Sequence, residues 1–160
     1  LYSLVRIFMH VVLYQPEIPP NVGNVARQCV GMDATLHIVG PHALDFSSSR
    51  VRRAGLDYWE HLRMQEHATP EDFEHWLGDR TPWLVTKFGD LRYDQPAYTA
   101  DDVLLFGNEL RGLPDAWHER WPGRRVSVPI LGQVRSYNLS NTVAMVLAAA
   151  SLRAGRFGKM

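Results

Sequence analysis

The sequence predicts an α/β fold with a mainly parallel sheet and flanking helices, and two observations carry that prediction. Short runs of β-branched and aromatic residues alternate with segments of helical periodicity along the chain. The length of 160 residues suits a single domain with one core. Because strands that alternate with helices are joined by crossover connections, neighbouring strands are expected to run parallel.

Two strands and a helix between them account for the start of the chain. Residues 9–14 are predicted as a strand that ends at the proline-rich segment QPEIPP. A helix follows from Pro20 to Gly31, because apolar residues recur there at helical spacing. Residues 35–39 form a second strand, and residues 47–55 form a short helix with a serine cap.

The alternation continues to the end of the chain. Acidic residues in the first turn favour a helix at 70–77, and an apolar run favours a buried strand at 103–107. The last helix starts near Asn138 or Ser140 and runs to Arg153, before Gly155. The other expected elements are strands at 61–67, 82–86 and 124–130 and a short helix at 114–121.

Composition excludes several classes of protein. Apolar residues make up 46% and charged residues 21%, which is typical of a globular chain. Seventeen basic residues balance seventeen acidic ones, so contacts with RNA must come from local basic patches. The single cysteine, Cys29, excludes an internal disulfide and Cys-rich zinc sites.

We assign residues 9–156 to one domain and residues 1–8 to an N-terminal extension or cloning remnant. Residues 1–8 lack the apolar core and the cleavage site of a signal peptide, so we expect a cytoplasmic protein. The longest apolar stretch, at 143–152, is too short to cross a bilayer, and we expect no membrane partner. The sequon at Asn138 is interpreted as a helix cap.

The common signatures of nucleotide-binding and hydrolytic enzymes are missing. The chain has no G-x-G, no G-x-x-x-x-G-K-[ST], no G-x-S-x-G and no H-E-x-x-H. No two histidines share one helix face at i, i+4, so we expect no metal site. We interpret five histidines as surface side chains, namely His37, His42, His61, His67 and His75.

Three segments suggest a functional site. Residues 16–27, PEIPPNVGNVAR, place Asn21, Asn24 and Arg27 at three-residue intervals near a helix start, where an anion could bind. An asparagine cap followed by a solvated arginine explains the pattern equally well. These residues become informative only together with the other two segments.

The second segment, 104–114, brackets a polar turn with Gly107 and Gly112, as expected where backbone approaches a ligand closely. An ordinary strand exit with a surface Glu–Arg pair explains it equally well. The third segment, 128–145, contains more Ser and Asn residues than one helix cap needs. Some of these side chains are therefore candidates for facing a ligand.

Taken together, the three segments resemble the motifs of SPOUT-class RNA methyltransferases. The similarity is to the short enzymes that methylate the 2′-hydroxyl of the tRNA wobble nucleotide 34, either a cytidine or a modified uridine. It runs from Met9 to about Gly155 and includes VVLYQPEIPPNVGNVAR, RRAGLDY and RSYNLSN. The resemblance implies S-adenosylmethionine as cofactor, tRNA rather than DNA as partner, a homodimer, and a deep C-terminal trefoil knot. General folding rules alone predict an unknotted chain.

The resemblance also implies residue roles. Arg27 matches the catalytic arginine, and Asn24 beside it is the expected orienting group in that comparison. Glu109, Asn138 and Leu139 belong to the same motifs and are expected near the pocket or the nucleotide. The implied cofactor positions are Val85, Gly107, Val128 and Ser136.

The residue types suit methyl transfer to a ribose hydroxyl without a metal. Arginine is a poor base because its pKa exceeds about 12. Our hypothesis is that Arg27 holds a phosphate and polarises the hydroxyl, with the proton leaving to that phosphate or to water. The expected RNA contacts come from Arg50, Arg52, Arg53, Arg124 and Arg125.

One departure from the family pattern lies in the last helix. Ala148, Ala149 and Ala150 stand where relatives carry Tyr-Glu-Ala, which removes an aromatic ring and a carboxylate. Two alternatives stay open at this point. The chain is either a SPOUT methyltransferase of another RNA position or rRNA, or a non-catalytic RNA-binding relative.

Overall fold

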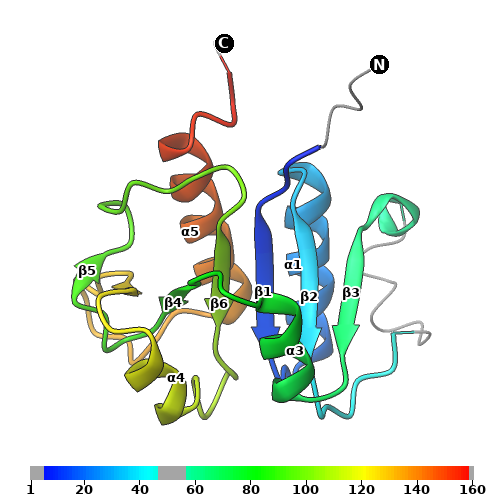
Figure 1. Ribbon diagram of the computed structural model, residues 1–160, viewed down its shortest axis with the longest axis horizontal. Coiled ribbons are helices and arrows are strands. Elements are labelled where there is room, and N and C mark those ends of the chain that lie inside the picture. Colours follow the sequence, from blue (N-terminus) through cyan, green and yellow to red (C-terminus); the bar gives the residue numbers. More distant parts are fainter. Residues whose placement is uncertain (1–5, 47–56, 159–160) are drawn as a thin grey trace.

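A single parallel sheet organises the part of the chain that the structure describes, residues 6–46 and 57–158 of this computed structural model. Its strand order is β3-β2-β1-β6-β4-β7-β5, and each named pairing is parallel (Figure 1). The predicted α/β class is therefore confirmed. The strands are β1 (His10–Tyr14), β2 (Thr35–Val39), β3 (Met64–His67), β4 (Trp83–Val85), β5 (Leu91–Arg92), β6 (Val103–Phe106) and β7 (Arg125–Ser127).

The helices also follow the predicted pattern, with ends shifted by one or a few residues. They are α1 (Pro19–Gly31), α3 (Pro70–Leu77), α4 (Asp115–Arg120), α5 (Leu139–Arg153) and the 3-10 turn η1 (Trp59–His61). The prediction missed β5 and η1, because two exposed residues and a single turn leave no periodic pattern. The helix predicted at 47–55 lies outside the described residues.

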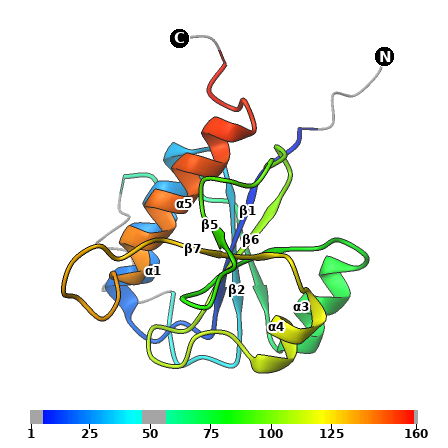
Figure 2. The ribbon, with the colours of Figure 1, turned by 90° about the vertical axis from the view of Figure 1, so that its left-hand side faces the viewer.

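Helices cover both faces of the sheet. Figure 2 shows α1 and α5 on one side and α3 and α4 on the other. In β1, Val11 and Leu13 pack into the core under α1 and α5, whereas Val12 packs into the core under α3 and α4. Because successive side chains point to opposite faces and both faces are covered, the central strands are apolar throughout.

The prediction that His37 and His67 lie on the surface is wrong. Both side chains are buried, and they form a hydrogen-bonded chain with His10. The His10 Nδ1 to His37 Nε2 distance is 2.9 Å, and the His37 Nδ1 to His67 Nε2 distance is 3.0 Å. The Trp76 ring of α3 packs against all three imidazoles. Sequence periodicity could not show that these polar residues satisfy one another.

Burial keeps this histidine chain neutral. Desolvation, reinforced by the neighbouring imidazoles and Arg80, lowers the pKa of His37 to about 3. Desolvation also lowers the pKa of His10 to about 4, with a smaller contribution from Arg80. His61 and His75 are exposed, as predicted. The face of the sheet under α3 therefore contains a polar cluster, unlike the apolar core under α1 and α5.

Candidate functional site

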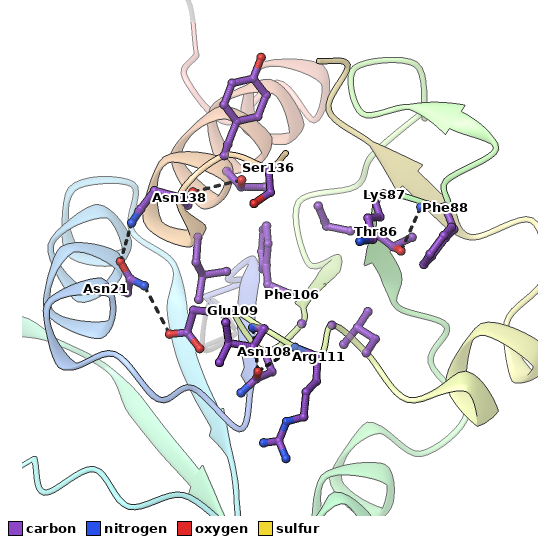
Figure 3. A pocket seen from close by; sticks show the side chains of 18 of the residues that line it. Asn21, Thr86, Lys87, Phe88, Phe106, Asn108, Glu109, Arg111, Ser136 and Asn138 are labelled. Carbon is purple, nitrogen blue, oxygen red and sulfur yellow. Dashed lines mark hydrogen bonds between the residues drawn. The ribbon is translucent and has the colours of Figure 1, made fainter. Parts of the chain in front are cut away.

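A cavity of about 440 Å³ opens at the carboxyl edge of the sheet. Residues 85–88 after β4, 106–113 around the end of β6, and 135–139 before α5 line most of it. Figure 3 shows Ser136 and Asn138 on one side of the cavity and Thr86, Lys87 and Phe88 on the other. This position agrees with the rule that parallel sheets bind ligands beyond the carboxyl ends of their strands.

The turn after β6 is held in shape by its own backbone. Asn108 and Gly112 exchange two backbone hydrogen bonds of 3.0 Å each. A Cβ on Gly107 would lie 2.5 Å from the carbonyl carbon of Gly112, so only glycine fits there. The need for glycine thus arises from this tight turn, rather than from the close approach of a ligand that the sequence suggested.

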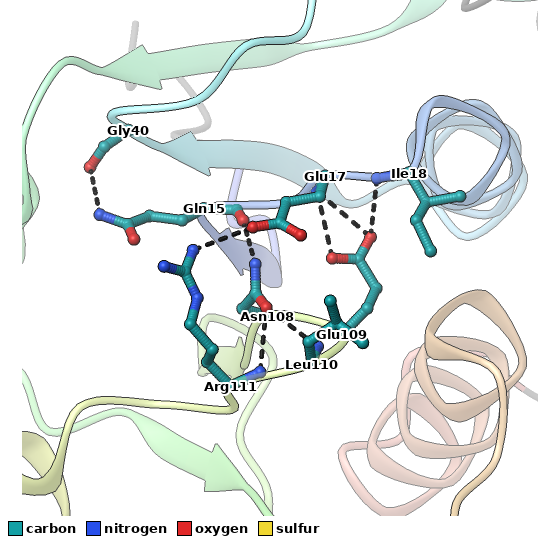
Figure 4. A network of polar contacts seen from close by, with 8 residues as sticks. All are labelled: Gln15, Glu17, Ile18, Gly40, Asn108, Glu109, Leu110 and Arg111. Atoms are coloured by element: carbon teal, nitrogen blue, oxygen red, sulfur yellow. Dashed lines mark hydrogen bonds and ion pairs between the residues drawn. The ribbon is translucent and has the colours of Figure 1, made fainter.

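Glu109 connects this turn to the start of α1 (Figure 4). Its carboxylate accepts hydrogen bonds from the backbone N–H groups of Glu17, at 3.1 Å, and Ile18, at 3.2 Å. Arg111 adds an ion pair with Glu17 at 3.0 Å. A carboxylate is favourable here because the first N–H groups of a helix have no partners within the helix.

Two asparagines extend the connection to α5. Asn21 Nδ2 donates to Glu109 at 3.4 Å, and Asn138 Nδ2 donates to the Asn21 side-chain oxygen at 3.0 Å. The Asn138 side-chain oxygen in turn accepts from Ser140 N–H at 2.9 Å, which confirms Asn138 as the cap of α5. Hydrogen bonds therefore join all three motif segments beside one cavity.

Most of the residues expected in the pocket do line the cavity. Val128 does not; it is half-buried and packs against the core at the end of β7. The expected residues that the structure gathers at the cavity are Val85, Gly107, Glu109, Ser136, Asn138 and Leu139.

Arg27 and Asn24 are exposed on α1 and do not line the cavity. The Arg27 guanidinium carbon lies 5.4 Å from the centroid of the Tyr58 ring. Burial raises the pKa of Tyr58, and the charge of Arg27 opposes this effect. Asn21, one helical turn before Asn24, is the α1 asparagine that borders the cavity.

The basic residues proposed for RNA contact divide into two groups. Arg50, Arg52 and Arg53 lie outside the described residues. Arg124 and Arg125 lie at the opposite end of β7 from the cavity, where they bind Thr81 and Asp90 respectively. These two arginines therefore have partners within the chain and do not line the cavity.

Sequence reasoning missed the side of the cavity formed by Lys87, Phe88 and His118. The sequence analysis pointed to three segments that follow or contain strand ends, namely residues 16–27, 104–114 and 128–145. The loop after β4 became relevant only because β4 pairs with both β6 and β7. That strand order leaves no signal in the sequence.

Two further findings concern the described residues. No helix among them is both long and apolar enough to span a bilayer. Within the same ranges, no group of three or more His, Cys, Asp or Glu side chains is arranged to hold a metal ion.

Comparison with known proteins identifies close relatives along nearly the full chain. A tRNA (cytidine(34)-2′-O)-methyltransferase of Burkholderia cenocepacia is 41% identical, covering 91% of this chain and 96% of that protein. The enzyme of the same name from Methylovorus glucosotrophus is 40% identical, covering 88% and 92%.

Solved structures agree with these relatives. A structure described as giving insights into 2-OH methylation of C/U34 on tRNA has a TM-score of 0.87 and 36% identity, covering 96% of this chain and 99% of that one. A SpoU methyltransferase of Streptomyces viridochromogenes in complex with AdoMet has a TM-score of 0.81 and 27% identity, covering 98% and 64%. The SpoU rRNA Methylase family matches residues 8–148. The resemblance found in the sequence is thereby confirmed, and the chain belongs to the SpoU rRNA Methylase family.

Proposed function

We propose that this protein transfers the methyl group of S-adenosylmethionine to the ribose 2′-hydroxyl of the wobble nucleotide 34 of tRNA, a cytidine or a modified uridine. The observation that carries the proposal is the cavity at which the three motif segments meet and are joined through Glu109, Asn21 and Asn138. Relatives that bear this activity in their names share 40% and 41% identity with the chain.

The lining of the cavity suits S-adenosylmethionine. Val85, Phe106 and Leu113 offer an apolar wall for a flat base, and the Ser136 hydroxyl borders it. The carboxylates of Glu109 and Asp115 line the same cavity, together with the cations of Lys87, Arg111 and Arg135. Charges of both signs suit a cofactor that carries a sulfonium and a carboxylate. The bound cofactor supplies an electrophilic methyl group, and no metal is needed for its transfer.

Arg27 has the role of positioning and polarising the substrate. A guanidinium has five N–H donors and no acceptor, so it binds a phosphate and stabilises charge on the 2′-oxygen rather than accepting the proton. The proton leaves to that phosphate or to water. The start of α1 and the start of α5 are held beside the cavity by the hydrogen bonds of Asn21, Glu109 and Asn138.

The active unit in this proposal is a homodimer. α5 buries Val146 in the core, yet it also exposes Ala144, Ala148 and Leu152 at intervals of four residues. A helix whose outward side is also apolar is expected to pack against another protein surface, here a second copy of the chain. Since Arg27 lies outside the cavity of its own chain, we assign it to the cavity of the second copy.

The C-terminal trefoil knot is also part of the proposal. In its support, the segment between β4 and β6 contacts both β7, through Tyr93 N–H to Ser127 O, and the end of α5, through Arg153 to Pro96 O. The knot can be tested by pulling the chain from its two ends. A knotted chain reaches a shorter stretched length than its contour length, and an unknotted chain reaches the full length.

The remaining expectations belong to the same proposal: residues 9–156 act as one methyltransferase domain in the cytoplasm, and Arg53 contacts tRNA. The direct test is transfer of labelled methyl to tRNA that lacks the modification, followed by nuclease mapping. Label in a 2′-O-methylated nucleotide 34 is the expected result. Label at another nucleotide would refute the substrate, and absence of label despite cofactor binding would refute the activity.

A further inference from the structure

An exposed aromatic ring stands at the mouth of the cavity. Phe88 follows β4 and lines the cavity on the side opposite Asn138 (Figure 3). Its side chain is 65% exposed, although full burial of a phenylalanine is worth about 1.5–3 kcal/mol. No element of the described chain covers it.

The loop that carries Phe88 is fixed to β7 and cannot easily retract the ring. Gly89 N–H donates to the Ser127 hydroxyl at 2.8 Å, and Thr86 N–H donates to Val126 O at 3.0 Å. A Cβ on Gly89 would lie 2.3 Å from the backbone of Val126, so the loop packs as closely as a glycine allows. The ring is therefore presented by a rigid support.

Polar groups suited to a nucleotide surround the ring. The His118 imidazole stands edge-on to Phe88, with centroids 6.3 Å apart, and borders the same cavity. Its Nδ1 atom is buried without a hydrogen-bond partner. Burial, together with the charge of Arg125, lowers the pKa of His118 and keeps the imidazole neutral. The Lys87 ammonium lies 5.6 Å from the Phe88 centroid.

We propose that Phe88 is a stacking platform for an unpaired nucleobase of the RNA substrate, with His118 at the edge of the base and Lys87 near its phosphate. Bases splayed out of single-stranded loops stack on aromatic rings, while nearby cations bind the backbone. This proposal rests on the proposed function, because it requires that the substrate be RNA. The cofactor occupies the more enclosed region lined by Val85 and Leu113.

Two substitutions of Phe88 test the platform. For Phe88→Ala, we expect kcat/KM for tRNA to fall about 5- to 150-fold, which is the range for loss of one base–aromatic stack, with an unchanged Kd for S-adenosylmethionine. Phe88→Trp retains a stacking surface and should restore most of kcat/KM. Phe157→Ala is the matched control, because Phe157 is also an exposed phenylalanine, lies outside the three motif segments and does not line the cavity. It should behave like the wild type.

Three results would overturn the platform. The first is an unchanged kcat/KM for Phe88→Ala, and the second is an equal loss of affinity for S-adenosylmethionine, which would assign the ring to the cofactor. The third is failure of Phe88→Trp to restore kcat/KM. If the wild type itself methylates no tRNA, the proposed function fails instead, so the two failures are distinguishable.

Discussion

The cavity and the outward surface of α1 and α5 differ in how many of their side chains have partners within the same chain. Around the cavity, Glu109, Asn21 and Asn138 are joined by hydrogen bonds, and a tight turn fixes Gly107. On the outward surface, the Arg27 guanidinium lies over the Tyr58 ring, and Leu152 is 68% exposed. In the function proposed above, one chain binds the cofactor and methyl transfer requires a second copy.

Replacing Arg27 has the largest expected effect, and it should affect methyl transfer but not cofactor binding. Arg27→Ala should lower the rate of methyl transfer by about 100- to 1000-fold, which is typical for loss of one charge-stabilising donor. The Kd for S-adenosylmethionine should change little, because in this proposal Arg27 holds a phosphate and the 2′-oxygen of the RNA rather than the cofactor, and it does not line the cavity of its own chain. Single-turnover transfer and calorimetric binding measure the two quantities. An Arg27→Lys protein that transfers methyl at the full rate would contradict the role of the planar guanidinium.

Gly107→Ala tests the cavity itself, and its expected effect is on cofactor binding. The added Cβ would lie 2.5 Å from the Gly112 backbone, so the turn must open. We expect at least about tenfold weaker binding of S-adenosylmethionine, since misplacing a ligand-binding loop costs more than about 1.4 kcal/mol. Gly31→Ala is the control, because Gly31 does not line the cavity and a Cβ added there would meet no described atom within 4 Å beyond its chain neighbours and its own helix. Equal Kd values for the two variants would show that the turn does not shape the site.

Leu152→Glu tests whether the outward side of α5 meets a second copy. A charge within an apolar interface should convert dimers to monomers and reduce transfer about tenfold or more. Sedimentation and transfer assays at equal protein concentration provide the measurements. His75→Glu, on the exposed side of α3, should leave both unchanged. A wild-type monomer with full activity would remove the need for the dimer.

The histidine chain comes last, because its effect is on stability rather than on either region. The pKa of His37 is lowered in the folded state, so protonation favours unfolding, and stability falls as the pH drops from about 6.5 towards about 3. At pH 5 the buried neutral imidazole costs about 2 kcal/mol, because its unfolded pKa is near 6.5 and each pH unit is worth about 1.4 kcal/mol.

This cost corresponds to a Tm that is roughly 4 to 8 °C lower at pH 5 than at pH 8. His37→Gln removes the titrating group and should make Tm less dependent on pH, whereas His61→Gln, at an exposed position, should not. Thermal unfolding across this pH range makes the comparison. An identical pH dependence in the wild type and His37→Gln would refute the assignment.

Much of the fold was predictable because strands such as residues 35–39 and 103–107 are apolar runs between helix signals. The strand order was not, since pairing of β4 between β6 and β7 depends on distant segments. The burial of His37 and His67 could not be predicted for a similar reason. Their burial depends on hydrogen bonds between three different strands.

The lining of the cavity was predictable at Gly107, where a motif follows an apolar strand, and at Val85 and Ser136, which the family resemblance supplied. The hydrogen bonds of Glu109 to the start of α1 could not be foreseen, because they join residues that are about ninety positions apart. The position of Phe88 at the cavity could not be predicted either, since the sequence does not show which residues lie beside a phenylalanine in a loop.

Mixed dimers test the central claim that the outward surface of one chain completes the cavity of another. Arg27→Ala keeps an intact cavity, and Ser136→Trp fills the cavity but keeps Arg27. Each variant alone should be inactive. After the two are mixed and reassembled, about a quarter of the wild-type transfer should return, because half of the dimers then carry one complete site out of two. Mixed dimers that form but transfer no methyl would contradict the account.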